Sequence, residues 1–355
     1  MFSIFTKKIF GLDISDYSIE AMELEQNFGK KNIKSYSRVK MESGIVENGK
    51  ILNLSKLASN VDEVLATAKP KAIKTKDVSI SLPDSQVYTA TINLPLDLKD
   101  SEITEAIANQ IPEIMPFDYN STVNAWQVLE KNDEEQTIFV AAVDREIYNG
   151  YEELAKKLNI RISSMEIESI ATARAVIDKI NSNEGVLLLD IGARTSNISV
   201  FYGLGLYSTH NVPVAGHTFT QAISEKLKIS FTEAEKLKIT NGLDYKKNQG
   251  ELLLIIQSHL QEILPEIKKS MSYFEDKTKK QINFGCLVGG SAFLNGLPEY
   301  LTANLKIKLE IGNPFTKIGN YAIIKKQGLL FANVLGLALR HIDDNSWQNN
   351  INFIK

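Results

Sequence analysis

The 355-residue sequence predicts an α/β fold of two related domains, with a small α+β subdomain inserted into the first domain. Three observations support this prediction. The chain is too long for one compact core and suits two domains. Its composition, 43% hydrophobic and 23% charged, is typical of a soluble globular protein. The same order of strands, turns and helices also occurs in both halves.

Two apolar strands that end in Asp-Ile mark equivalent points of the two halves. The first contains Asp13 in GLDIS and the second contains Asp190 in LLLDIGA, about half the chain further on. Each is followed by two more β-like runs, which are residues 18–24 and 33–39 in the first half and 197–202 and 206–212 in the second. The repetition predicts two domains built on one plan.

The remainder of the first half predicts a helix, a strand and then an insertion. Asn53 can cap a helix with one apolar face, and DVSISL (77–82) alternates as a strand. After Pro83 the pattern changes to three half-solvated strands and two helices, which Asp100 and Asp144 can begin. These strands are residues 86–94, 122–129 and 137–143.

The second half adds helices to the shared plan. We expect helices over 218–227 and 232–239, a long helix over 250–279 that contains Pro265, a strand over 282–288, a Gly-Gly turn, a helix to about 305, a strand over 307–311 and a last helix over 329–341. The expected domains are 1–82 with 159–182, the insertion 83–158, a second domain 183–342 and a polar tail 343–355.

Charge and composition exclude several classes of protein. A net charge of −3 gives no support to a nucleic-acid binder that works through a basic surface. The single cysteine, Cys286, excludes an internal disulfide and a cysteine-based zinc site. No apolar run approaches the length of a membrane span, and the N-terminus does not read as a signal peptide. We therefore expect a cytoplasmic protein.

The two Asp-turns predict a phosphate clamp. A carboxylate at a strand end can hold a hydrated Mg²⁺, while the amides of the following turn face phosphate oxygens. In the second turn, Gly192 allows a close backbone approach, and Thr195 and Ser196 supply hydroxyls. One such tripeptide is usually only a strand-to-turn transition, but two at equivalent places favour a nucleotide.

Two further segments fit the same nucleotide. Gly289 and Gly290, between a strand and a helix, would let an adenine or ribose approach the backbone, although they could simply shape a turn. Glu235 and Lys238, one helical turn apart, could grip ribose hydroxyls or a purine edge, although alone they would be an ordinary ion pair.

These segments together carry a family resemblance. The order GLDIS, LLLDIGARTSNISV, VPVAGHTFTQAI, AEKLK, LVGGSAFLNGLPEYL and VLGLALR resembles the actin-like ATPase superfamily, which has a duplicated ribonuclease H-like fold. Within that superfamily the chain resembles the PilM family of type IV pilus assembly proteins, which is related to FtsA. The matching segments for this branch are ESGIVENGKI, VSISLPDSQVYTATINLP, IPEIMPF and ESIATARA.

The resemblance implies ATP and Mg²⁺ in a central cleft. Asp13 and Ser15 would form the first phosphate loop, and Asp13 and Asp190 would hold the metal through water. Gly216 would approach the nucleotide, Glu235 and Lys238 would take the ribose or base, and Gly289 and Gly290 would border the adenosine. Glu168 would orient water for a slow ATPase, with the alternative that it only stabilises a helix start.

The resemblance also implies partners. The junction of the inserted subdomain with the first domain would hold a cytoplasmic N-terminal segment of a PilN-type membrane protein, so that membrane contact is indirect. Pilus motor ATPases would be further partners, and nucleic acid would not be one. The alternatives are an FtsA-like membrane-tethered filament protein, a GspL-like type II secretion component and a sugar kinase.

Three features depart from the family pattern or extend it. Ser15 stands where the first phosphate loop usually has glycine, and Glu20 stands where it usually has a basic residue. The C-terminal NINFIK (350–355) is similar to the Ile-Asn-aliphatic segment of PilN proteins and could occupy the partner groove in cis or in a neighbouring molecule. The alternative is an exposed, frayed terminus.

Overall fold

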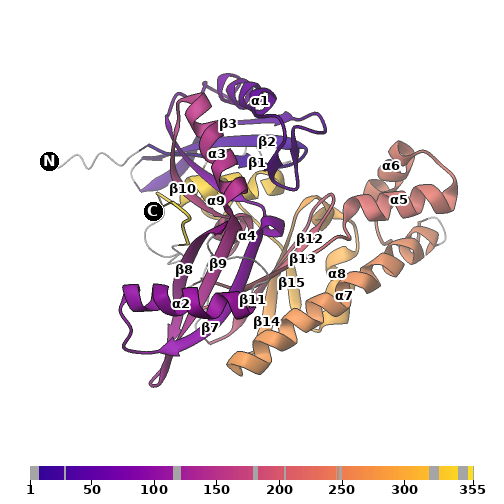
Figure 1. The fold of residues 1–355 in the computed structure, drawn as a ribbon. Helices are drawn as coiled ribbons and strands as arrows, with labels where there is room; N and C mark the ends of the chain where they lie inside the picture. The colour runs from indigo at the N-terminus through magenta and orange to yellow at the C-terminus, as the bar shows by residue number, and fades with distance from the viewer. Residues whose placement is uncertain are drawn as a thin grey trace. The chain divides into compact units, whose positions relative to one another are not determined.

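The computed structural model of the chain describes residues 8–27, 29–114, 121–178, 183–203, 205–244, 246–247, 250–319, 328–342 and 351–354. It divides into two compact units (Figure 1). The first unit is Met1–Lys179 with Asn313–Lys355, and the second unit is Ile180–Gly312. Each unit is built around one five-stranded mixed sheet.

The sheet of the first unit has the order β10-β6-β1-β2-β3. Antiparallel pairing joins β1 to β2 and β2 to β3, whereas β6 runs parallel to both β1 and β10. Its strands are β1 (Phe10–Ile14), β2 (Ser18–Asn27), β3 (Lys30–Lys40), β6 (Asp77–Leu82) and β10 (Arg161–Ile167).

The sheet of the second unit repeats this arrangement with the order β13-β12-β11-β14-β15. Two antiparallel pairs again lie on one side of the first strand, and two parallel pairs lie on the other. The duplication predicted from the two Asp-Ile strands is therefore confirmed. Its strands are β11 (Gly185–Ile191), β12 (Ser196–Tyr202), β13 (Gly205–Val212), β14 (Ile282–Val288) and β15 (Lys308–Ile311).

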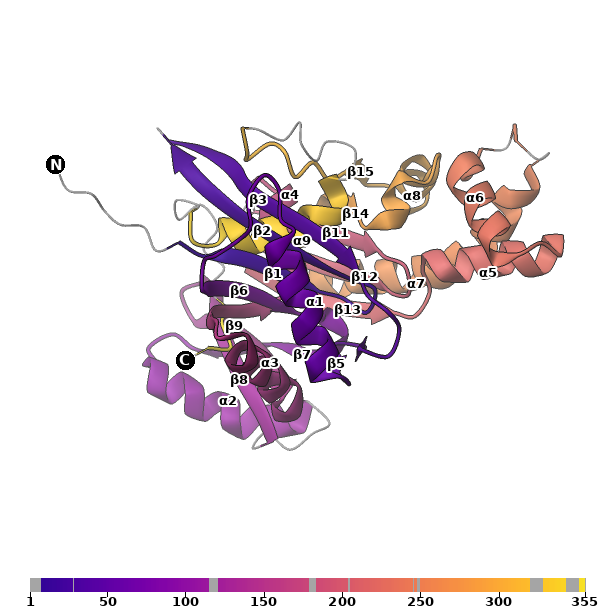
Figure 2. The ribbon, with the colours of Figure 1, turned by 90° about the horizontal axis from the view of Figure 1, so that it is seen from above.

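Helices cover both faces of the first sheet (Figure 2). On one face lie α1 (Leu54–Ala66), whose N-cap Asn53 accepts from the amide of Lys56, and α3 (Arg145–Leu158), which Asp144 caps. On the other face lie α4 (Glu168–Val176) and α9 (Ala332–Leu339), which pack on each other. These hydrogen bonds confirm the caps at Asn53 and Asp144, whereas Asp100, which was also expected to cap a helix, is the first residue inside α2.

The insertion in the first unit forms a separate antiparallel sheet with one helix on it. The sheet has the order β7-β9-β8, and the isoleucines of α2 pack on its apolar side. This matches the predicted α+β module. Helix α3, which follows β9 at the end of the insertion, packs on helix α1 of the first unit. The elements are β7 (Val87–Pro95), α2 (Asp100–Ile114), β8 (Thr122–Lys131) and β9 (Glu135–Asp144).

The described residues of the second unit include four helices, in the order expected from the sequence. The longest, α7, contains Pro265 as predicted, and it packs on β12 and β13. The helices are α5 (Gly216–Leu227), α6 (Phe231–Asn241), α7 (Glu251–Thr278) and α8 (Leu297–Leu305), with a 3-10 turn η4 (Gly290–Phe293) before α8.

The last part of the chain belongs to the first unit, whereas the sequence placed residues up to 342 in the second domain. All eight residues of α9 are buried, because this helix lies between the first sheet and α4. A methyl group added at Gly11 of β1 would lie 2.5 Å from the carbonyl oxygen of Val334, so strand and helix are in close contact. This packing holds the part of the chain that follows the second unit against the first unit.

The C-terminal segment Ile351–Ile354 is also part of the first unit. Ile351 and Phe353 are 0% and 1% exposed, and the amide of Phe353 donates to the carbonyl oxygen of Met165 on β10 at 2.9 Å. The expectation of an exposed, frayed terminus is therefore wrong for this segment. Asn350 and Lys355, at the ends of the NINFIK motif, lie outside the described residues.

Candidate functional site

The second unit brings Asp190 and Gly289 together at the ends of two neighbouring strands. Asp190 on β11 pairs in register with Val288 on β14, and Gly289 follows directly. A methyl group added at Gly289 would lie 2.3 Å from Oδ1 of Asp190, and the φ of Gly289 is +84°. Glycine is therefore required at 289 to leave room for the Asp190 carboxylate.

Three loops meet around the carbonyl oxygen of Gly192. The amide of Gly216 donates to this oxygen at 3.1 Å, and Oγ of Ser291 lies at 3.4 Å from it. The amide of Gly192 donates to the carbonyl of Thr195 at 3.1 Å, which closes the turn between β11 and β12. Residues about 100 positions apart in the sequence thus form one continuous surface of backbone.

The other residues predicted for this site differ in their burial and in the space around them. Thr195 is half-buried, whereas Ser196 is buried, and its hydroxyl donates to the carbonyl of Val214 at 2.6 Å. The Ser196 hydroxyl is therefore engaged in holding the loop before α5. Gly290 differs from Gly289 because a methyl group there would meet no atom within 4 Å.

Lys238 on α6 points its ammonium group at the start of α5. Nζ donates to the carbonyl of Gly216 and to Oγ1 of Thr220, each at 2.8 Å, and it pairs with Glu235 at 2.8 Å. Thr220 also donates to Glu235. The side chain of Lys238 is 6% exposed and that of Glu235 is 37% exposed, so Glu235 is the member of the pair that a ligand can reach.

The electrostatics of this pair follow from its burial. Burial lowers the pKa of Lys238, although the Glu235 carboxylate opposes the shift. Burial alone would raise the pKa of Glu235, but hydrogen bonds from Lys238 and Thr220 outweigh it and hold the pKa below its usual value. The Glu235 carboxylate is therefore ionised at neutral pH and forms a fixed anion at the exposed end of the pair.

Two residues of this site were missed by the sequence analysis. Thr220 lies one helical turn after Gly216 and Ser291 lies directly after the Gly-Gly turn, so their spacing to predicted residues could have identified them. His217 lies beside them, with its ring 5.6 Å from the ring of Phe231. Burial and the Lys238 charge lower the pKa of His217, so its imidazole is neutral at pH 7.

In the first unit, the loop after Asp13 is closed by a serine hydroxyl. Oγ of Ser15 accepts from the amides of Ser18 and Tyr17, at 3.1 and 3.3 Å, and donates to the carbonyl of Ser18 at 3.1 Å. Ser15 thus stabilises a tight turn at a position where the family pattern has glycine. Asp13 is half-buried at the end of β1, opposite Glu20 on β2.

Glu20 is paired with a cation on the neighbouring strand. Its carboxylate accepts from Nε of Arg38 on β3, and Arg38 also donates to the hydroxyl of Ser18 at 3.1 Å. Burial raises the pKa of Glu20, while Arg38 opposes the shift. The acid that departs from the family pattern is therefore accompanied by its own positive charge.

Glu168 lies in the first turn of α4, which packs on β10 and β6. Burial raises the pKa of Tyr151, and the charges of Asp13, Glu168 and Asp16 raise it further, so this side of the unit carries a negative field. Oδ2 of Asp84 accepts from the amide of Ser169 at 3.0 Å and caps α4 from another segment. Glu168 is thus not the group that this amide binds.

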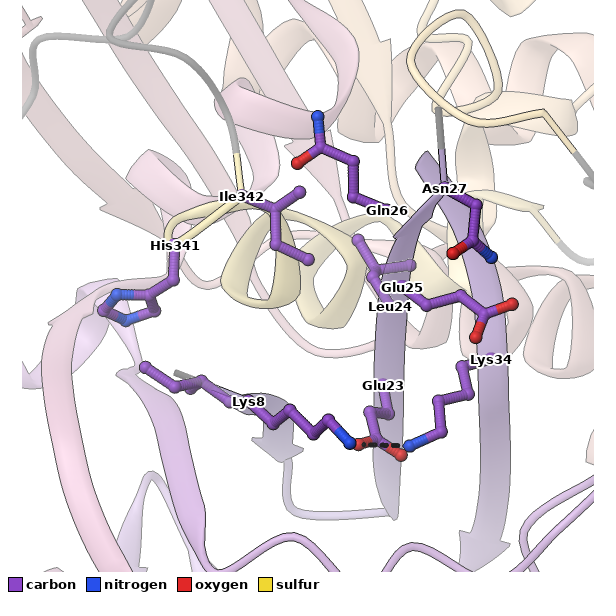
Figure 3. Close-up of a pocket in the computed structure, with 10 residues that line it drawn as sticks. Lys8, Glu23, Leu24, Glu25, Gln26, Asn27, Lys34, His341 and Ile342 are labelled. Atoms are coloured by element: carbon purple, nitrogen blue, oxygen red, sulfur yellow. Dashed lines mark hydrogen bonds and ion pairs between the residues drawn. The ribbon is translucent and has the colours of Figure 1, made fainter. Parts of the chain in front are cut away.

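The first unit also contains a cavity of about 300 Å³ that the sequence did not predict. Figure 3 shows Lys8 and Lys34 on either side of the Glu23 carboxylate, with Lys34 bonded to it at 2.9 Å. Thr75 also donates to Glu23, at 2.6 Å. The buried acid is therefore satisfied from within the unit.

The described part of the chain contains neither a membrane-spanning helix nor a cluster of metal ligands. No helix there is long and apolar enough to cross a membrane. No group of three His, Cys, Asp or Glu side chains there is placed to hold a metal ion. A cation at Asp13 or Asp190 would therefore need oxygen ligands from water or from a bound phosphate.

Comparison with known families gives one match over most of the chain. The sequence profile of the type IV pilus assembly protein PilM family matches residues 11–342. Among single proteins, the cell division protein FtsA of Streptococcus pneumoniae is 22% identical over 85% of this chain and 75% of its own length. FtsA of Enterococcus faecalis is 22% identical over 84% of this chain and 77% of its length.

Solved structures share the fold. A PilM-PilN type IV pilus biogenesis complex matches with a TM-score of 0.78 and 22% identity, over 95% of this chain and 99% of that chain. MreB5 of Spiroplasma citri bound to ADP matches with a TM-score of 0.57 and 13% identity, over 97% and 99% of the two chains. At these identities the matches show an actin-like fold, which agrees with the predicted fold class.

Proposed function

Because the chain belongs to the PilM family of type IV pilus assembly proteins, we propose that it is an ATP-binding actin-like scaffold of pilus assembly that binds a PilN-type protein. The observation that carries this proposal is the family match over residues 11–342. The structural similarity to PilM in a PilM-PilN complex supports it, because it extends over 95% of this chain. The partner would be a cytoplasmic N-terminal segment of the PilN-type protein, with pilus motor ATPases as further partners.

The nucleotide proposal rests on the surface around Gly192. Gly290 is exposed and leaves its backbone open, Gly216 packs closely against Gly192 and Ser291, and Glu235 offers a fixed carboxylate to ribose hydroxyls. Lys238 supports this surface by holding Gly216 and Glu235 rather than by direct contact, because its ammonium is buried. An actin-like relative, MreB5, binds ADP.

We propose that the turn after Asp13 in the first unit and the turn after Asp190 in the second unit each serve as a phosphate loop. Asp13 and Asp190 each end the equivalent strand of their unit, and each carboxylate would hold Mg²⁺ through water. When bound, Mg²⁺ neutralises phosphate charge. Arg38 supplies the positive charge that Glu20 would otherwise remove from the first loop. Glu168 is the residue proposed to orient a water molecule during slow hydrolysis.

Membrane association would be indirect in this proposal, through the PilN-type partner at the inner face of the cytoplasmic membrane. The FtsA relatives support a second candidate, a membrane-tethered filament protein. Sedimentation with anionic lipid vesicles distinguishes the two. The scaffold proposal expects the purified chain to remain in the supernatant unless the partner is present, whereas pelleting of the chain alone favours the tethered filament.

The nucleotide site is tested by filling the open space at Gly290. We expect Gly290→Ala, Gly290→Val and Gly290→Phe to weaken ATP binding progressively, with at least a tenfold loss for Phe, and to leave the melting temperature nearly unchanged. Isothermal titration with ATP·Mg²⁺ measures the affinity. Equal affinity across the series would show that the nucleotide does not approach Gly290.

The partner is tested with a synthetic peptide of the PilN-type N-terminal segment. Its dissociation constant is measured with and without ATP·Mg²⁺, because nucleotide and partner binding are reciprocally linked if they are coupled at all. A difference of fivefold or more supports a nucleotide-dependent scaffold. Equal values leave a static adaptor, and absence of binding in both conditions would remove the partner from the proposal.

A further inference from the structure

The C-terminal segment Ile351–Ile354 occupies the edge of the first sheet. β10 is the last strand of that sheet, so one side of it has no neighbouring strand in the described part of the chain. Exposed strand edges accept extended peptides, because their backbone N–H and C=O groups form a ready template. In Figures 1 and 2 the yellow C-terminal segment lies beside this edge, next to the inserted strands β8 and β9.

Both backbone groups of Met165 are used by this segment. Its amide donates to Oδ1 of Asn352 at 2.9 Å, and its carbonyl accepts from the amide of Phe353 at 2.9 Å. Oδ1 of Asn352 also accepts from the amide of Ile354 at 3.2 Å. The Asn352 carboxamide therefore stands where a partner strand would present a carbonyl, and it fixes the backbone of its own segment.

The apolar side chains on either side of Asn352 are fully enclosed. Ile351 and Phe353 are 0% and 1% exposed, although they lie within five residues of the chain terminus. The edge of β10 thus holds a short extended segment of the pattern apolar–Asn–apolar.

We propose that this segment is an intramolecular occupant of a peptide groove, and that it must leave before a segment of the PilN-type partner can pair with β10. The identity of the partner rests on the proposed function, whereas the occupied groove rests on the contacts of Met165. In the sequence, residues 343–350 lie between Ile342, which follows α9, and this segment. Such a short tether gives a high effective concentration, which excludes a competing peptide until the competitor is abundant or tighter.

The first test uses the segment itself as the probe. A fluorescein-labelled peptide of residues 347–355 is titrated into the full chain and into a chain that ends at Ile342. We expect the shortened chain to bind the peptide and the full chain to bind it at least tenfold more weakly. The matched control is the same peptide with Asn352→Ala, which removes the acceptor for Met165 and should not bind the shortened chain.

A full-length variant covers the case in which the shortened chain does not fold. In the chain carrying both Asn352→Ala and Phe353→Ala, the Met165 amide should exchange with deuterium faster than in the natural chain, and the labelled peptide should bind. If the peptide binds neither variant while both are folded by circular dichroism, or if Met165 exchange is unchanged, the inference is overturned.

A second probe separates this inference from the proposed function. A PilN-type N-terminal peptide should bind the shortened chain at least tenfold more tightly than the full chain. Equal affinities overturn the competition while leaving the proposed partner intact. If the PilN-type peptide binds neither chain, the proposed partner is wrong. The experiment with the 347–355 peptide and the shortened chain is independent of that result, and it still decides whether the segment occupies the groove in cis.

Discussion

A methyl group added at Gly336 of α9 would lie 1.7 Å from the carbonyl oxygen of Ala171 on α4. Even a methyl group would overlap this oxygen, so glycine at 336 allows the two helices to contact through their backbones. This contact joins the last helix to one that precedes it by more than 150 residues.

Replacing Gly336 by alanine should destabilise the protein strongly. Because the obstacle is backbone on both sides, relaxation would require the helices to separate, and we expect a loss of about 3 kcal/mol or more in the free energy of unfolding. Chemical denaturation measures it. The control is Gly150→Ala in α3, where the nearest atom would be 3.7 Å away and alanine should stabilise the helix by about 0.5–1 kcal/mol. Equal effects of the two changes would contradict the close contact.

The buried ion group around Glu166 should respond to both mutation and acid. Arg174 binds this carboxylate at 2.6 and 2.7 Å, and Arg340 donates to it as well. Glu166→Gln would leave two guanidinium groups without a counterion, so we expect a loss of about 3 kcal/mol at pH 7. Glu42→Gln at the exposed Lys56 pair is the matched control and should change little.

The difference in the free energy of unfolding between the natural chain and Glu166→Gln should depend on pH, and its direction follows from the pKa of Glu166. Burial alone would raise the pKa of Glu166, but Arg174 and Arg340 hold the pKa below its usual value. A lowered pKa in the folded state contributes stability that is present above about pH 4.5 and is lost as the pH falls further. The difference between the natural chain and Glu166→Gln should therefore shrink below pH 4.5, and a difference that grows there would contradict the assignment.

Lys317 should also make stability rise with pH, but in alkaline solution rather than in acid. Its ammonium donates to the carbonyls of Arg174 and Ile177 at 2.7 and 2.9 Å, and burial lowers its pKa to about 8. Between about pH 8 and pH 10.5 the unfolded chain binds the proton that the folded chain has released, so stability from this group rises with pH. Melting temperatures of the natural chain and Lys317→Met should diverge in this window, whereas exposed Lys268→Met should follow the natural chain.

Glu168 should affect turnover rather than nucleotide affinity. If it orients water, Glu168→Ala will leave the ATP dissociation constant within about threefold and abolish slow phosphate release, because only the reacting state loses an interaction. Phosphate release in single-turnover experiments measures this. Glu251→Ala, which removes an acid from the first turn of α7, is the matched control and should retain turnover. Unchanged release in Glu168→Ala would remove the assignment.

The duplicated fold could be predicted because its signal is local. Strands β1 and β11 end in the same Asp-Ile pair, and the alternating runs that follow each of them form β2, β3, β12 and β13. The second-unit surface was also largely predictable, since glycines and an Asp-turn mark its loops in the sequence. Its supporting bonds were not, because the contact of Lys238 with Gly216 depends on how α6 packs on α5.

Strand β10 was not predicted, because its pattern is interrupted by a charge. Glu166 is fully buried, and in the sequence such an acid indicates a solvent-facing position. Its counterions, Arg174 and Arg340, come from a later helix and from the far end of the chain, so no local window contains the reason for its burial. The pairing of Glu20 with Arg38 was missed for the same reason, since it depends on the register of β2 and β3.

The return of the chain to the first unit determines the order in which the protein can be completed during synthesis. The second unit is one continuous stretch, Ile180–Gly312, and all its contacts are available once that stretch has left the ribosome. The first unit, although translated first, lacks α9 and the Arg340 counterion until almost the whole chain has emerged. Domains ordinarily fold from the N-terminus onward. Here the first unit becomes complete only after the second, because Glu166 and Gly11 find their partners Arg340 and Val334 in residues that follow the second unit.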